Sequence, residues 1–141
     1  MKEENSRSFD ELVVGQRAAV EKTITEKDVN LFAEVSGDFN PVHTNEEFAK
    51  QTRFKRRIAH GMLAASLVSR VIGTKMPGPG TIYLSQTLNF KAPVYFGDTI
   101  SAEVEIIEKI DAKNFAKLKT VCTNQTGTVI LEGEALVLFG K

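Results

Sequence analysis

The feature that most constrains the fold is a long apolar segment in the middle of the chain. Residues 60–72, HGMLAASLVSRVI, are almost all apolar or small. The segment is shorter than the roughly 18 apolar residues of a membrane span, and it lacks the polar face of a surface helix. We therefore expect a buried central helix here. Residues 76–80, MPGPG, end it, because two prolines cannot continue a helix.

Strand-like segments surround this helix in the sequence. One is expected near residues 17–22, and the others follow the helix at residues 81–91, 99–109, 116–123 and 128–139. One buried helix followed by a run of strands predicts an α+β fold, with an antiparallel sheet wrapped around the helix. The 141 residues contain no repeat or linker, so we expect a single domain over residues 1–141.

Composition narrows the classes of partner. Lys plus Arg and Asp plus Glu both total 18, so the formal net charge is zero. Without a global field, we expect neither a nucleic acid nor a membrane as partner. The single cysteine, Cys122, cannot form an internal disulfide, and we interpret it as a small core residue. The amino terminus lacks an apolar signal segment, which predicts a cytoplasmic protein.

Two short helices are predicted before the apolar segment. The first is capped by Thr25 and ends at Gly37, a residue that tolerates a left-handed backbone. The second spans residues 46–51, with Thr44 or Asn45 as its cap. The chain between them is therefore expected to be a loop.

That loop, within SGDFNPVH at residues 36–43, places an acid and an imidazole five residues apart. The Asn-Pro pair inside it is a strong turn signal, so Asp38 and His43 can face a common point. A carboxylate beside an imidazole can hold and deprotonate a water molecule. In the alternative interpretation, Asp38 only caps backbone amides around Asn40, and His43 is an ordinary loop residue.

Other catalytic chemistries lack their motifs. A serine hydrolase would need an elbow such as G-x-S-x-G, and zinc chemistry would need H-E-x-x-H or paired C-x-x-C. Neither pattern occurs, and the nucleotide-binding pattern G-x-G-x-x-G is also missing. We therefore expect no metal and no cofactor.

The start of the apolar helix is a second candidate region. Backbone amides at a helix start are unpaired, so the amide of Gly61 could stabilise an oxyanion, and a glycine lets a substrate approach closely. Gly61 could equally serve local packing. We expect His60 to support the neighbouring loop. Ser66 and Ser69 are expected to be buried, bonded to the carbonyl four residues back or supporting the acid–imidazole pair.

One basic cluster lies between these regions, comprising Arg53, Lys55, Arg56 and Arg57. A solvated surface is one interpretation. The other is that the cluster binds the phosphates of a large anionic substrate.

Three stretches resemble a known family. Residues 32–43 (FAEVSGDFNPVH), 58–73 (IAHGMLAASLVSRVIG) and 78–100 (GPGTIYLSQTLNFKAPVYFGDTI) are similar to the MaoC-like (R)-specific enoyl-CoA hydratases. The likeness runs from about Phe9 over nearly the whole chain. The family usually has an Asp-Pro pair shortly after the histidine, where this chain has Thr44-Asn45-Glu46. This departure bears on the loop more than on the chemistry.

The resemblance implies a hot-dog fold and a homodimer or higher homo-oligomer, with active sites near the subunit interface. It implies that Asp38 and His43 are catalytic and that the Gly61 amide binds a thioester carbonyl. It also assigns supporting roles to Asn40 and Ser69. Met62, next to Gly61, is a further candidate substrate contact.

The implied reaction is reversible addition of water to a trans-2-enoyl-CoA, giving the (R)-3-hydroxyacyl-CoA without a metal or redox cofactor. One rival is a dehydratase acting on thioesters of acyl carrier protein. A thioesterase is a weaker enzyme alternative. A rival of another class is a hot-dog protein that binds acyl thioesters without turnover, for which an acid–base pair would have no use.

Overall fold

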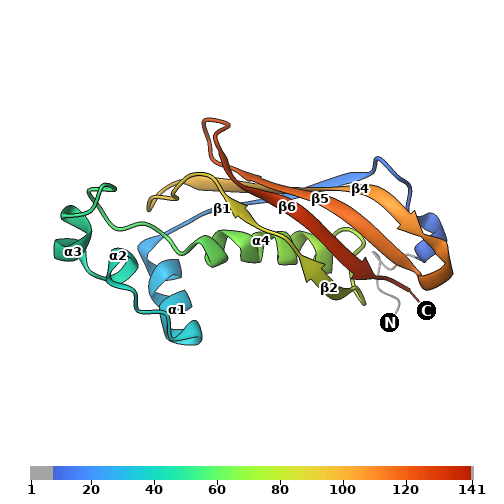
Figure 1. Ribbon diagram of the computed structural model, residues 1–141, viewed down its shortest axis with the longest axis horizontal. Coiled ribbons are helices and arrows are strands. Elements are labelled where there is room, and N and C mark those ends of the chain that lie inside the picture. The colour runs from blue at the N-terminus through green and yellow to red at the C-terminus, as the bar shows by residue number, and fades with distance from the viewer. Residues whose placement is uncertain (1–7, 141) are drawn as a thin grey trace.

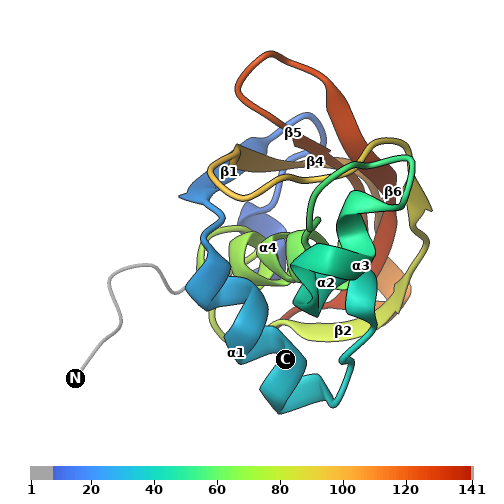
Figure 2. The same cartoon turned by 90° about the vertical axis from the view of Figure 1, so that its left-hand side faces the viewer.

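An antiparallel sheet curls around one long helix, as predicted (Figure 1). The computed structural model describes residues 8–140. The strand order is β1-β4-β5-β6-β2, and β3 also pairs with β6. Viewed from the end, the curved sheet wraps over one side of α4 (Figure 2). The strands are β1 (Arg17–Thr23), β2 (Ile82–Gln86), β3 (Asn89–Phe90), β4 (Thr99–Ile110), β5 (Phe115–Thr123) and β6 (Val129–Leu138).

The central helix α4 (Gly61–Thr74) packs one face onto the sheet. Strands β4 and β5 alternate buried and more exposed positions along much of their length, as expected when one face of a sheet lies on a core. Cys122 of β5 is fully buried, which confirms it as a core residue, and burial raises the pKa of its thiol to about 12. The buried residues of α4 are Ala64, Leu67, Val68, Val71 and Ile72.

The opposite face of α4 is exposed, so the prediction of a wholly buried helix is wrong. Met62 is 56% exposed, and both Ser66 and Ser69 are exposed. The Ser66 hydroxyl donates to the carbonyl of Leu63, three residues back rather than four. The physical reason is that the sheet of one chain covers only one side of the helix. No helix within residues 8–140 is long and apolar enough to cross a bilayer.

The strand predicted over residues 81–91 is interrupted and forms β2 and β3 instead. At the break, the Thr87 amide donates to the Glu134 carbonyl, and the Glu134 amide donates to the Thr87 hydroxyl, both at 2.9 Å. A Cβ atom at Gly133 would overlap the Thr87 carbonyl oxygen. The chain therefore approaches β6 too closely here for any residue but glycine.

Three short helices lie together beyond one end of the sheet (Figure 1). They are α1 (Glu26–Ser36), α2 (Pro41–Thr44) and α3 (Glu46–Lys50); single 3-10 turns occur at Phe9–Glu11 and Asp111–Lys113. Thr25 and Asp28 form the capping box of α1, and Gly37 ends it with a left-handed φ of 78°. Of the two candidate caps for α3, the structure uses Asn45.

Candidate active site

His43 lies in a single helical turn, α2, and not in the loop that was predicted. Asn40 caps this turn, because its side-chain oxygen accepts from the Val42 amide at 3.2 Å. Pro41 occupies the first helical position, where its missing amide hydrogen costs nothing. The Asn-Pro pair is therefore a helix start as well as a turn signal.

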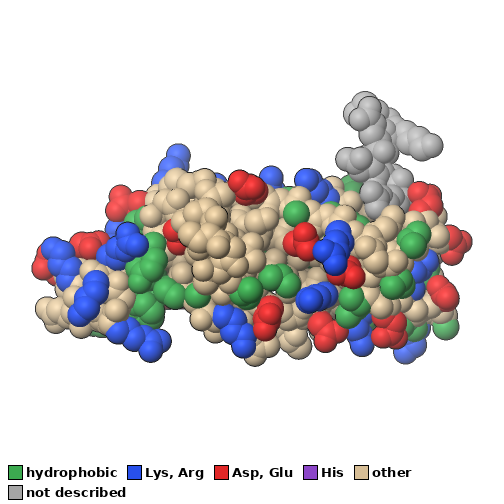
Figure 3. Space-filling view, turned by 90° about the horizontal axis from the view of Figure 1, so that it is seen from above, with side chains coloured by type: hydrophobic (Ala, Val, Ile, Leu, Met, Phe, Trp, Pro, Cys, Tyr) green, Lys and Arg blue, Asp and Glu red, His purple; other side chains and the backbone are tan. Residues whose placement is uncertain are grey.

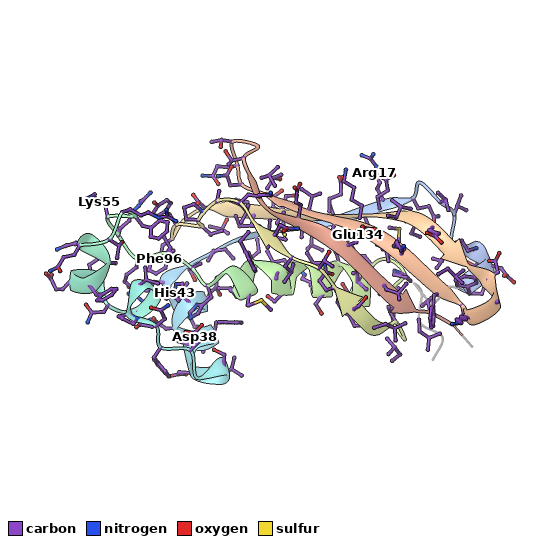
Figure 4. All side chains as sticks on the ribbon, in the orientation of Figure 1. Arg17, Asp38, His43, Lys55, Phe96 and Glu134 are labelled. Atoms are coloured by element: carbon purple, nitrogen blue, oxygen red, sulfur yellow. The ribbon has the colours of Figure 1, made fainter. Side chains whose placement is uncertain are left out.

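Asp38 precedes this turn and keeps half of its carboxylate free. Its Oδ1 accepts from the Asn40 amide at 3.1 Å, so the capping role considered as the alternative is present. The other oxygen has no hydrogen-bond partner among residues 8–140, and the side chain is exposed. Capping and catalysis are thus compatible in one carboxylate. Figure 4 shows Asp38 and His43 together beyond the end of the sheet.

One ring nitrogen of His43 is engaged by the backbone. Its Nδ1 lies 2.8 Å from the Ile58 carbonyl oxygen. A carbonyl can only accept, so Nδ1 carries the hydrogen, and in the neutral ring Nε2 has a free lone pair. Burial lowers the pKa of His43 below its ordinary value of 6.5, and nearby His60 lowers it further; the bond to Ile58 and the charge of Asp38 act in the opposite direction. The neutral ring is therefore the favoured form near pH 7.

His60 contacts both candidate catalytic residues. It is 2% exposed, and its Nε2 donates to the Asp38 backbone carbonyl at 2.9 Å. Its ring centroid lies 4.0 Å from that of His43 and 4.7 Å from that of Phe32. The Nδ1 atom of His60 is buried and has no hydrogen-bond partner within the described part of the chain, residues 8–140.

Asp38, His43 and His60 each bring one potential ligand atom within 4.8 Å of the other two. Two of the four imidazole nitrogens already donate to backbone carbonyls. The rings also overlap with an interplanar angle of 33°, whereas metal ligation needs nitrogens aimed edge-on at one point. The arrangement fits an acid–base cluster better than a metal centre.

A cavity of about 400 Å³ joins His43 to the start of α4. Gly61 is the first residue of that helix, where no helical acceptor exists for its amide, and the N-cap residue His60 provides no side-chain cap. The ring of half-exposed Phe90 covers this glycine, because an added Cβ would lie 2.7 Å from Phe90 Cε1. The lining also includes Arg53, Phe54, Ile58, Ala59, Met62, Lys91, Ala92, Pro93, Val94 and Ile130.

The remaining predicted residues divide between three places. Arg53 reaches the cavity, while Lys55 and Arg56 are exposed on the same segment. Ser69 lies in a neighbouring groove of about 480 Å³, between α4 and β2, which shares Met62 with the cavity. Arg57 is turned inward and bonded within the chain, unlike the substrate contact that was predicted.

Two site residues were not identified from the sequence. Ile58 contributes through its backbone carbonyl, for which its side-chain type gives no signal. Phe90 contributes a ring over the helix start. The only signal for Phe90 was its position inside the similar stretch at residues 78–100.

Comparison with known families gives a decisive match. The family described as "MaoC like domain" matches residues 11–129. The chain belongs to the MaoC-like family. The matched region contains all the candidate catalytic residues.

Relatives of this MaoC-like chain are enzymes by name. It is 50% identical over 130 residues to an (R)-specific enoyl-CoA hydratase of Rhodospirillum rubrum, covering 92% of this chain and 90% of the relative. It is 40% identical over 137 residues to a mitochondrial 3-hydroxyacyl-[acyl-carrier-protein] dehydratase of Solanum lycopersicum, covering 96% and 82%. The unliganded R-hydratase of Pseudomonas aeruginosa superposes with a TM-score of 0.90 at 48% identity, covering 95% and 86%. The MaoC-like chain thus has the hot-dog fold that the resemblance implied.

Proposed function

We propose that this MaoC-like chain is a hydro-lyase that adds water reversibly to trans-2-enoyl-CoA, giving (R)-3-hydroxyacyl-CoA. The observation that carries the proposal is that the neutral imidazole of His43 and the helix-start amide of Gly61 line one cavity, while the half-free carboxylate of Asp38 lies within 4.8 Å of a ring nitrogen of His43. Named relatives at 50% and 45% identity are (R)-specific enoyl-CoA hydratases. A protein that only binds thioesters would have no use for this pair.

The geometry supports a division of roles. The Gly61 amide would donate to the thioester carbonyl, which makes the β-carbon electrophilic and stabilises the enolate charge. The free oxygen of Asp38 and the Nε2 atom of His43 would hold one water molecule. As its oxygen bonds to the β-carbon, His43 accepts the proton. The α-carbon then receives a proton from the same side, which regenerates the neutral imidazole.

The outer part of the substrate would contact the basic cluster. Arg53, Lys55 and Arg56 remain available to phosphates, and Figure 3 shows basic side chains gathered at this end of the molecule. Arg53 also lines the cavity that His43 and Gly61 share. The same surface suits an acidic acyl carrier protein, and the Solanum relative carries that substrate in its name. A dehydratase acting on carrier-protein thioesters is therefore the second candidate.

We further propose a homodimer or a higher assembly of dimers. Strand β2 is an edge of the sheet, and its apolar residues Ile82 and Leu84 are 55% and 43% exposed. An exposed apolar edge favours pairing with a second strand. A second chain here would also cover Met62 and the groove that holds Ser69. Sedimentation of the wild type and of Leu84→Lys tests the proposed dimer: a monomeric wild type would contradict it.

The cytoplasmic location stays a prediction from the sequence.

The test of the activity is loss of the conjugated-thioester absorbance of crotonyl-CoA after addition of purified protein, followed by analysis of product chirality. We expect an (R) product. Parallel assays with octenoyl-CoA and with carrier-protein thioesters separate the two enzyme candidates. No turnover of any of these substrates would favour a binding protein, and an (S) product would contradict the hydratase assignment.

A further inference from the structure

Arg57 is the one member of the basic cluster that the chain itself surrounds. Its side chain is only 10% exposed. Nε donates to the His43 carbonyl at 2.6 Å, and the two terminal nitrogens donate to Glu26 at 2.8 Å and Asn30 at 2.9 Å. The guanidinium also lies 4.9 Å from the ring centroid of Phe96. Each of the three nitrogens has an acceptor within the chain, so the guanidinium is committed to contacts inside the protein.

The residue after Arg57 completes a three-bond clamp on the turn that carries His43. The Ile58 amide donates to the Val42 carbonyl at 3.2 Å, and His43 Nδ1 donates to the Ile58 carbonyl at 2.8 Å. Together with the Arg57 bond, these contacts hold His43 both by its main-chain carbonyl and by its ring. The Arg57–Ile58 segment is also paired with the chain that leads into β4, because Ile58 forms an isolated β-bridge with Tyr95.

The turn α2 needs such a clamp, because it has only four residues. A single turn is not stable by itself, since nucleation fixes several dihedrals for one hydrogen bond. The orientation of the His43 ring is therefore set by external contacts. The His43 carbonyl also belongs to the last turn of α2, where unpaired carbonyls attract a cation. Arg57 supplies that cation and thereby links the end of α2 to α1. In Figure 4, the labelled residues His43 and Phe96 lie at this same end of the molecule.

We propose that Arg57 is a positioning residue for the reaction, which aligns the His43 imidazole by holding its carbonyl against α1. This inference rests on the proposed function. It replaces the phosphate-binding role expected from the sequence. Displacing a catalytic group by about 1 Å can cost on the order of a hundredfold in rate. Loss of Arg57 should therefore act on turnover and not on substrate affinity.

The kinetic test compares Arg57→Met and Arg57→Lys with the wild type on crotonyl-CoA. Methionine keeps the length of the stem without donors, and we expect kcat to fall about tenfold or more while KM changes less than about twofold. Lysine keeps the charge but reaches fewer acceptors, so its kcat should be intermediate. A KM that rises with kcat unchanged would show that Arg57 binds substrate and would overturn the proposal.

A control separates positioning from general destabilisation. Val104→Ala removes fully buried volume in β4, at a residue that lines neither the cavity nor the neighbouring groove, and should lower the melting temperature without lowering kcat. The untagged chain has only two histidines, so the ring NMR signals of His43 are readily assigned. We expect Arg57→Met to shift these signals and Val104→Ala to leave them in place. Unchanged His43 signals in Arg57→Met would overturn the proposal even if the wild type were inactive on every thioester, so this failure is distinguishable from failure of the proposed function.

Discussion

The imidazole ring of His60 lies against that of His43, with 4.0 Å between centroids, while its Nε2 atom holds the Asp38 carbonyl at 2.9 Å. One buried side chain therefore contacts both members of the candidate pair. His60 contacts His43 by ring packing and Asp38 by a hydrogen bond to its main-chain carbonyl. Substitutions can test both contacts.

We expect Asp38→Asn and His43→Gln each to lower the hydration rate by on the order of a hundredfold or more, because each removes a general acid–base group. Asparagine can still accept from the Asn40 amide, so the turn should remain intact. Initial rates on crotonyl-CoA measure the effect, and far-ultraviolet circular dichroism checks the fold. Full activity in both variants would show that the site lies elsewhere.

His60→Phe should lower kcat and move the acidic limb of the pH–rate profile to higher pH. Phenylalanine keeps the ring contact with His43 but leaves the Asp38 carbonyl without its donor. It also removes a neighbouring imidazole that lowers the pKa of His43, so that pKa should rise. The groups facing His43 are Asp38, His60 and the Arg57 guanidinium on its carbonyl. An unshifted acidic limb would contradict the coupling of the two rings.

The lowered pKa of His43 also predicts a pH dependence of stability. Between its folded pKa and the ordinary value of 6.5, the unfolded chain binds more protons than the folded chain. The free energy of unfolding therefore rises with pH in this window. The His43 contribution is fully present above about 6.5 and is lost as pH falls toward the folded pKa. Denaturant unfolding at pH 7.5 and 5.5 measures it, and His43→Gln should show a smaller difference than the wild type.

Gly61→Ala should reduce activity, because the new methyl group would lie 2.7 Å from the Phe90 ring. The ring is 52% exposed, so it can turn away instead of disrupting the core. Adding Phe90→Ala to Gly61→Ala should restore part of the kcat if the ring clash is the cause. Non-additivity in the double-mutant cycle measures this coupling. Simple additivity of the two losses would exclude it.

Gly133→Ala should destabilise the fold by about 3 kcal/mol or more, since the methyl group meets backbone that cannot move without breaking the β3–β6 contacts. Gly73→Ala in α4 is the matched control. A methyl group there meets nothing within 4 Å, and alanine is favoured over glycine in a helix by about 0.5–1 kcal/mol. Urea unfolding of both variants should therefore give changes of opposite sign.

Local signals predicted much of this fold. Thr25, Gly37 and Asn45 act as helix boundaries through contacts within four residues, so their roles were readable from the sequence. The break between β2 and β3 was not readable, because it depends on bonds between Thr87 and Glu134. Long-range register decides such irregularities.

In the candidate site too, features set by local contacts were predicted and features set by long-range contacts were not. Asp38 and His43 were predicted because a short turn brings them together. The inward role of Arg57 was missed, since its partners Glu26 and Asn30 lie 31 and 27 residues earlier in the chain. A run of basic residues looks uniform in sequence, and only the packing distinguishes the buried member from its exposed neighbours.

The imidazole of His43 lies on α2 and the carboxylate of Asp38 lies in the link between α1 and α2, both beyond the sheet, whereas the amide proposed to bind the carbonyl begins α4. Residues 45–60 join α2 to α4, and the last four of them make the hydrogen bonds that hold the two parts together. We expect substitutions in the groove between α4 and β2 to alter the preferred length of the acyl chain while the proton-transferring pair stays in place, because that groove contains neither Asp38 nor His43.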